Sequence, residues 1–148
     1  MRRFILDTNI VLQIIRDNDR FSEISSSLSL DSSDSTILIS IVTKAELLAL
    51  GKKNGWGQKK LSILNRLLEE LFIIDINNSD TALIEAYSVI DAFSQGILED
   101  KPLNTTARNM GKNDLWIAAT AFVAKADLVT MDGDFDHLHK EFITIHKF

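Results

Sequence analysis

The sequence contains no cysteine, and this absence excludes a disulfide framework, a thiolate zinc site and a cysteine nucleophile. Histidine is scarce as well, because the three histidines all lie within the last dozen residues, which argues against a histidine-rich metal site. The glycine-rich phosphate-binding patterns GxxxxGKS/T and GxGxxG do not occur, and no serine–histidine arrangement stands out as a nucleophile. The chemistry of this chain is therefore expected to come from other side chains.

The chain is also poor in the features that mark disorder or membrane insertion. Six glycines and one proline leave little room for low-complexity segments. No uninterrupted apolar run approaches the roughly 20 residues that a membrane-spanning helix needs. We therefore expect one domain over residues 1–148, without a membrane segment, in a soluble cytoplasmic protein.

Charge is unevenly distributed along the sequence. The net charge of −5 counts against a nucleic-acid-binding protein when it is taken alone. The stretch KKNGWGQKK nevertheless carries four lysines and no acid, and a second basic group precedes residue 113. A solvated face is the common explanation for such runs, and contacts with nucleic-acid phosphates are the alternative. The candidate residues for such contacts are Lys52, Lys53, Lys59, Lys60, Arg108 and Lys112.

Short apolar runs alternate with longer amphipathic segments, which predicts strands alternating with helices. The expected strands are 3–6, 36–39, 71–74, 127–130 and 142–145. The expected helices are 9–16, 21–30, 40–50, 59–70, 79–96 and 113–124. The third of these should stop at Gly51, a normal residue for a helix end. The pattern predicts an α/β fold, a three-layer α/β/α sandwich around a mainly parallel sheet.

Acidic residues occur where ligands bind in such folds, just beyond the carboxyl ends of strands. Asp7 follows the first predicted strand in LDTN, and Asp132 follows the fourth in LVTMDGDF. Asp114 opens the apolar segment NDLWIAATAFVA. Each has an ordinary alternative, since Asp7 and Asp114 could cap helices and Asp132 could belong to an Asp-Gly turn. Asp134 and Asp136 add two nearby acids that the sequence does not rank.

Glu46 lies inside the predicted helix 40–50, in TKAEL. Steps of three and four from it reach Val42, Ala49 and Leu50, so we expect the glutamate on an apolar face. A glutamate there is desolvated unless it is paired or bound to a cation. The alternative is a capping box from Thr43 to Glu46, which requires the helix to begin at Thr43.

These acids are more informative together than separately. Carboxylates that converge in a cleft repel one another and raise each other's pKa, and a divalent cation removes that cost. A ligand set of oxygens alone favours Mg²⁺ or Mn²⁺ over zinc. Such a site suits phosphoryl chemistry with one metal ion or two.

LDTNI, TKAEL, NDLWIAATA and LVTMDGDF, in this order and spacing, resemble the PIN domain, and most closely the VapC-type toxins of bacterial toxin–antitoxin pairs. The resemblance covers essentially the whole chain. It implies an endoribonuclease that depends on Mg²⁺ or Mn²⁺, forms a homodimer and is blocked by a cognate antitoxin. The family's catalytic and metal-binding acids match Asp7, Glu46, Asp114 and Asp132, with Asn9 and Thr130 in supporting positions and Asp134 as a substitute for the fourth acid.

Other functions remain open at this stage. A PIN-like module that binds RNA or protein without catalysis would keep the same residues. A haloacid-dehalogenase-type phosphatase needs a second aspartate two places after the first, where this chain has Asn9. A receiver domain needs paired acids near the first strand and a late lysine after a strand, and neither is found. The sequence does not indicate the RNA target.

Overall fold

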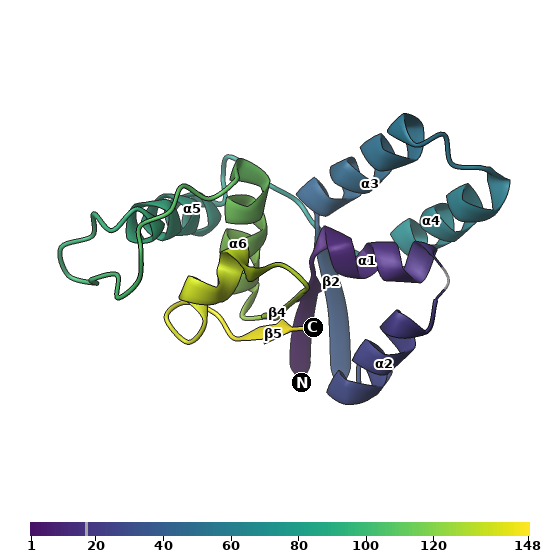
Figure 1. The fold of residues 1–148 in the computed structure, drawn as a ribbon, viewed down its shortest axis with the longest axis horizontal. Coiled ribbons are helices and arrows are strands. Elements are labelled where there is room, and N and C mark those ends of the chain that lie inside the picture. The colour runs from purple at the N-terminus through teal and green to yellow at the C-terminus, as the bar shows by residue number, and fades with distance from the viewer. Residues whose placement is uncertain (17) are drawn as a thin grey trace.

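The computed structural model describes residues 1–16 and 18–148, and its centre is a sheet of five parallel strands (Figure 1). The order across the sheet is β3-β2-β1-β4-β5, and every neighbouring pair is parallel. β1, at the centre, buries Phe4, Ile5 and Leu6 completely, as expected for a strand covered on both faces. The strands are β1 (Arg2–Leu6), β2 (Ser35–Ser40), β3 (Phe72–Ile74), β4 (Asp127–Thr130) and β5 (Ile145–Lys147).

Helices cover both faces of this sheet, which confirms the predicted three-layer fold. Phe4 and Leu6 point into a core shared with the helices of one layer, and Ile5 points into a second core on the opposite face. The first layer holds α1 (Thr8–Ile15), α2 (Asp19–Leu28), α3 (Ile41–Lys53) and α4 (Gln58–Glu70). The second holds α5 (Thr81–Ser94), α6 (Lys112–Ala124) and the 3₁₀ helix η1 (Gly133–Leu138). Within the described residues, no helix is long and apolar enough to cross a membrane.

Three sequence-based predictions of local structure were wrong. α3 does not end at Gly51 but continues to Lys53, and Gly51 is buried inside it. A Cβ atom at Gly51 would lie 3.2 Å from Cε3 of Trp56, so the glycine allows the indole ring to pack closely against the helix. The last strand is Ile145–Lys147 rather than 142–145. After Asp132 the chain forms η1, where only a turn was expected.

The carboxyl ends of β1, β2 and β4 lie at one edge of the sheet, and each is followed at once by a helix. Asp7, Ser40 and Asp132 are the N-cap residues of α1, α3 and η1. The fold therefore brings residues that are far apart in the sequence to a single edge.

Candidate active site

Asp7 is both a helix cap and a buried acid at the centre of this edge. Its Oδ1 accepts a hydrogen bond from the Thr8 backbone N–H at 2.8 Å, and its Oδ2 accepts one from Thr130 Oγ1 at 2.7 Å. The residue is only 5% exposed. Burial raises the pKa of Asp7 even though these two hydrogen bonds lower it, and the charges of Glu46 and Asp132 raise it further. The capping role and a functional role are therefore compatible.

Asp114 is not the cap of α6. The helix begins at Lys112 after the N-cap Gly111, and Asp114 lies in its first turn. Burial raises the pKa of Asp114 to about 7, and the neighbouring acids, with Asp7 first among them, contribute to the rise. This half-buried carboxylate consequently titrates near neutral pH when no cation is bound.

Asp132 and Asp134 both approach Asp114. One carboxylate oxygen from each of these three residues lies within 4.8 Å of the other two, a separation that suits shared coordination of one cation. Asp132 Oδ1 also accepts a hydrogen bond from the Asp134 N–H at 2.9 Å, which fixes the first turn of η1. Asp136 is different, because its Oδ2 accepts from Lys147 Nζ at 2.6 Å.

Glu46 joins the same group of acids from α3. Ser40 is the N-cap of α3, and its Oγ accepts from the Val42 N–H, so the alternative capping box at Thr43 does not form. Glu46 Oε1 instead accepts from Thr8 Oγ1 at 2.9 Å. Its negative charge raises the pKa of both Asp7 and Asp114.

The expected apolar setting of Glu46 needs a correction. The buried positions of α3 are Thr43, Leu47 and Gly51. The stripe Val42, Ala49 and Leu50 lines an open groove of about 430 Å³ together with Glu46 and Asn113, so Glu46 is half-buried rather than enclosed.

Hydroxyl and amide groups hold the acids in place. Thr130 Oγ1 donates to Asp7 and accepts from the Asp132 N–H at 3.0 Å, so it links two of the acids. Asn9 Oδ1 accepts from the Met131 N–H at 3.2 Å and ties α1 to the end of β4. Sequence reasoning missed the hydrogen bond from Thr8 to Glu46. The signal for it was weak, a threonine directly after the first acid in LDTN.

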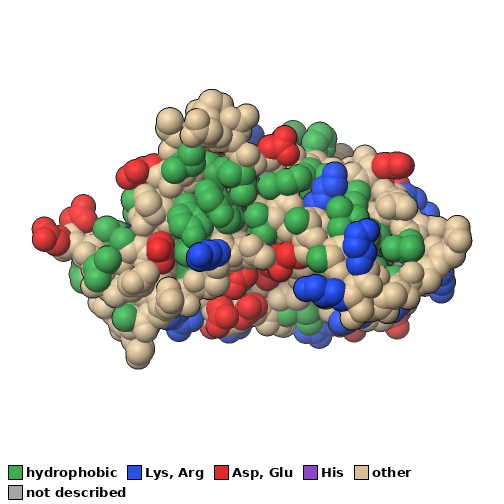
Figure 2. Space-filling model, turned by 90° about the horizontal axis from the view of Figure 1, so that it is seen from above, with side chains coloured by type: hydrophobic (Ala, Val, Ile, Leu, Met, Phe, Trp, Pro, Cys, Tyr) green, Lys and Arg blue, Asp and Glu red, His purple; other side chains and the backbone are tan. Residues whose placement is uncertain are grey.

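The two basic groups differ in how they are placed. The Arg108 guanidinium donates to the backbone carbonyl of Asp134 at 3.3 Å and of Gly133 at 3.5 Å, so it supports the start of η1. Lys112 is exposed at the first position of α6. Lys52 and Lys53 end α3, while Lys59 and Lys60 lie in the first turn of α4. The face of the molecule drawn in Figure 2 carries acidic side chains near its middle and several basic side chains to one side of them.

A serine–histidine pair does form between α5 and η1, but it is buried. Ser94 Oγ lies 2.7 Å from His137 Nε2, and Ser94 is 0% exposed. Within the described residues, His137 Nδ1 has no hydrogen-bonding partner. Burial, followed by the charge of Arg108, lowers the pKa of His137. The pair fastens η1 to the end of α5 and is closed to a substrate.

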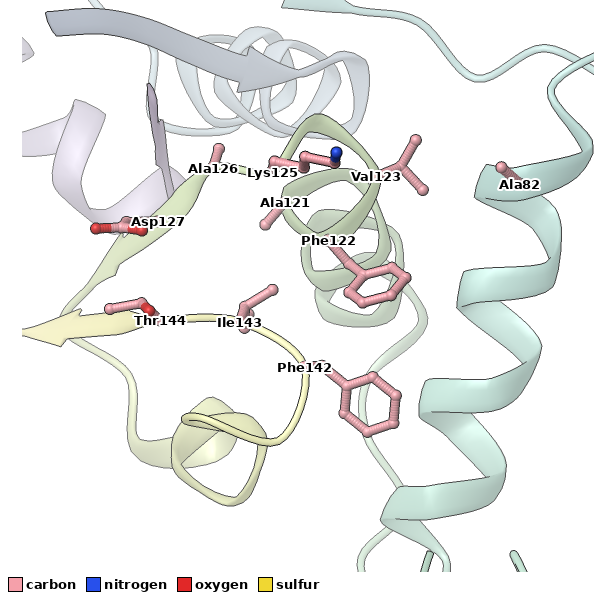
Figure 3. Close-up of a pocket in the computed structure, with 10 residues that line it drawn as sticks. All are labelled: Ala82, Ala121, Phe122, Val123, Lys125, Ala126, Asp127, Phe142, Ile143 and Thr144. Atoms are coloured by element: carbon pink, nitrogen blue, oxygen red, sulfur yellow. The ribbon is translucent and has the colours of Figure 1, made fainter. Parts of the chain in front are cut away.

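Another hollow lies away from the acids. It measures about 480 Å³ and is bounded by the end of α6 and the segment before β5, including Phe122, Phe142 and Ile143 (Figure 3). Among the described residues that line it, Asp127 is the only one with a carboxylate, and His146 Nε2 lies 2.8 Å from Asp127 Oδ2. This hollow has no group of converging acids, so the candidate active site is the acidic edge.

The chain resembles several solved toxin–antitoxin structures over its full length. A chain of VapBC2 from Rickettsia felis, bound to a DNA fragment from their promoter, is 25% identical, with a TM-score of 0.72 over 99% of this chain and 98% of that one. VapBC-1 from nontypeable Haemophilus influenzae is 22% identical, with a TM-score of 0.69 over 98% and 97%. VapBC-5 from Mycobacterium tuberculosis, a member of the VapBC family of toxin–antitoxin systems, is 19% identical, with a TM-score of 0.64 over 100% of both chains.

Sequence comparisons identify the family directly. Curated protein sequences give no significant match. The PIN domain family matches residues 4–141, nearly the whole chain and all of the acidic edge. The chain therefore belongs to the PIN domain family.

Proposed function

We propose that this protein is an endoribonuclease that depends on Mg²⁺ or Mn²⁺ and acts as the toxin of a toxin–antitoxin pair. The observation that carries the proposal is the convergence of acids on Asp114, whose pKa is raised to about 7. Such repulsion is costly unless a cation neutralises it. Carboxylate oxygens without histidine or cysteine suit a hard divalent ion.

The acids would divide the work between holding an ion and handling a proton. Asp7, Asp114 and either Asp132 or Asp134 would hold the cation, which when bound lowers the pKa of a water molecule and stabilises charge on phosphate oxygens. Glu46, oriented by Thr8, would complete the site and position the attacking water. Thr130 would keep Asp7 and Asp132 aligned.

Binding of RNA would rely on the basic side chains around the acidic edge. Lys52, Lys53, Lys59, Lys60 and Lys112 would contact phosphates, whereas Arg108 would mainly hold η1 because its guanidinium already bonds the backbone there. The toxin role and a cognate antitoxin are supported by the VapBC structures that the chain resembles. A homodimer is part of the proposal because the resemblance to VapC-type toxins implies it. An RNA-cleaving toxin of this kind would act in the cytoplasm.

Two substitutions test the catalytic part. We expect Asp7→Asn and Asp114→Asn to lower the rate of RNA cleavage by more than about 100-fold, the upper range for losing a group that only supports a metal ligand. Cleavage of a fluorescent RNA with Mg²⁺ or Mn²⁺ measures the rate, and circular dichroism checks the fold. Asp136→Asn is the control, because Asp136 belongs to the same 3₁₀ helix but pairs with Lys147.

Full activity in either variant, or in excess chelator, would contradict the proposal. A protein that binds RNA but gives no heat with millimolar Mg²⁺ or Mn²⁺ would instead be a binding module. The toxin role has its own test, since expression should arrest growth and Asp7→Ala should relieve the arrest.

A further inference from the structure

Another pocket lies at the C-terminal end of α3, apart from the acids. It has a volume of about 300 Å³ and is formed where the ends of α1 and α3 meet the start of α4. Leu12, Ile15 and Leu50 give it apolar walls, and Trp56 adds an aromatic one. Small-ligand sites span roughly 300–1,000 Å³, so this volume suits a single flat group rather than a chain segment.

The indole ring of Trp56 packs closely against α3, but its N–H has no hydrogen-bond acceptor among the described residues. The absence of a Cβ at Gly51 lets the indole pack at close range on α3, since such an atom would lie 3.2 Å from Cε3. Glycine is unfavourable inside a helix, so this contact explains why one is present there. An aromatic ring in a fixed position with a spare donor is well suited to a stacking ligand.

The rim of the pocket is polar and positively charged. Arg16, Asn54 and Lys60 surround the opening, and Lys60 Nζ lies 5.9 Å from the centroid of the Trp56 ring. In the part of the chain that the structure describes, neither Arg16 nor Lys60 forms an ion pair with a carboxylate. The rim therefore suits a ligand that combines an aromatic face with negative charge.

The pocket and the groove at the acidic edge are neighbours that share one wall residue. Leu50 is a wall of this pocket and also of the groove that contains Glu46 and Asn113. Asn54, the C-cap of α3, lies eight residues after Glu46, which corresponds to about 12 Å along the helix axis. An RNA strand whose scissile phosphate lies at the acids can therefore place a base a few nucleotides away in the pocket.

We propose that this pocket receives one unstacked base of the single-stranded RNA substrate, packed against Trp56, with adjacent phosphates on Lys60 and Arg16. The proposal rests on the proposed function. Proteins that recognise single-stranded RNA splay out bases, stack them on aromatic rings and follow the backbone with cations. A peptide of a protein partner also suits a basic rim, but the aromatic wall and the position beside the groove of the acidic edge favour a nucleobase.

Fluorescence of Trp56 tests the pocket directly. Trp116→Phe makes Trp56 the only tryptophan, and Asp7→Asn prevents cleavage during the measurement. We expect a short mixed-sequence single-stranded oligoribonucleotide to quench and shift the Trp56 emission. Unchanged emission on RNA that binds by an independent assay would overturn the proposal.

Affinity measurements provide the second test. Anisotropy of a labelled form of the same RNA, in the Asp7→Asn background, should show roughly 5- to 150-fold weaker binding for Trp56→Ala, as expected for loss of base stacking. Trp56→Phe keeps a ring and should retain most of the affinity, which guards against a variant that merely misfolds. Lys60→Gln should weaken binding. Lys125→Gln, at the C-terminal end of α6 and away from this pocket, should not.

The outcomes separate this proposal from the proposed function. If the unmodified protein cleaves RNA but Trp56→Ala and Lys60→Gln bind it with parental affinity, only the pocket assignment fails. If Trp56 responds to RNA but the unmodified protein cleaves none, only the catalytic function fails. A pocket that responds to a partner peptide, with RNA affinity unchanged by its substitutions, would overturn the nucleobase assignment.

Discussion

Asp114 is the residue at which burial and repulsion between the acids of this edge most clearly disfavour the charged carboxylate. It lies in the first turn of α6, where the helix dipole favours a negative charge and lowers a carboxyl pKa. Its pKa is nevertheless raised to about 7, so burial and the charges of Asp7, Asp132, Glu46 and Asp134 outweigh the dipole. The metal-free protein is therefore destabilised by its own site.

This cost should depend on pH in a predictable direction. Between the ordinary pKa of 3.8 and about 7, folded Asp114 binds more protons than unfolded Asp114, so stability falls as pH rises through that window. We expect Asp114→Asn to raise the melting temperature in chelator at pH 8 and to leave it nearly unchanged at pH 4. Thermal unfolding at both pH values measures the difference.

Mg²⁺ supplies the control for this prediction. A saturating ion should stabilise the unmodified protein and reduce the advantage of Asp114→Asn, because an ion that binds only the folded state raises its stability. An equal gain at both pH values would mean that the asparagine acts through packing rather than charge. His137, whose pKa is lowered, titrates in both proteins and largely cancels in the comparison.

At the scale of elements, the sequence predicted those site residues that lie just after the end of a strand. Asp7 and Asp132 come directly after apolar runs, and parallel strands bring their carboxyl ends to one edge. Periodicity predicted α3 but not its end, because Gly51 serves the packing of Trp56 rather than a helix stop. Local patterns of this kind carry no information on a distant aromatic ring.

Side-chain contacts between distant elements could not be predicted. Thr8 and Glu46 are 38 residues apart, and Ser94 and His137 are 43 apart. Their pairing depends on how α1 packs beside α3 and η1 beside α5. The approach of Asp134 to Asp114 depends on η1, and an Asp-Gly sequence predicts only a turn there.

The buried Ser94–His137 contact should matter for stability through η1. Among the described residues, Ser94 is the only hydrogen-bonding partner of His137 Nε2. Ser94→Ala therefore leaves a buried polar atom unsatisfied, which costs about 1–3 kcal/mol of unfolding free energy. Ser88→Ala on the same helix is the matched control, because Ser88 is exposed and its loss should stay within about 0.5 kcal/mol. Urea denaturation measures both, and equal stability of the two variants would contradict a structural role for the contact.

At the scale of the whole molecule, acidic and basic side chains occupy separate areas of the surface, which the net charge of −5 does not reveal. The acids gather near the middle of the face at the carboxyl edge, and basic side chains lie to one side of them (Figure 2). Lys52 and Lys53 stand at the end of α3, and the Trp56 pocket with Lys60 at its rim lies beside them. RNA affinity should therefore depend on where the charges lie rather than on their sum.

Two double substitutions with the same change in net charge test whether RNA affinity depends on the location of the lysines or on the total charge. In the Asp7→Asn background, the logarithm of RNA affinity should fall linearly with the logarithm of salt concentration, by about 0.7 for each phosphate contact to a single strand. Lys52→Gln with Lys53→Gln should reduce that slope by up to about 1.4. Lys125→Gln with Lys140→Gln, which precede β4 and β5 at the opposite edge, should leave it unchanged. Equal slopes for the two double variants would remove Lys52 and Lys53 from the RNA contact, and an equal reduction in both would show that total charge governs binding.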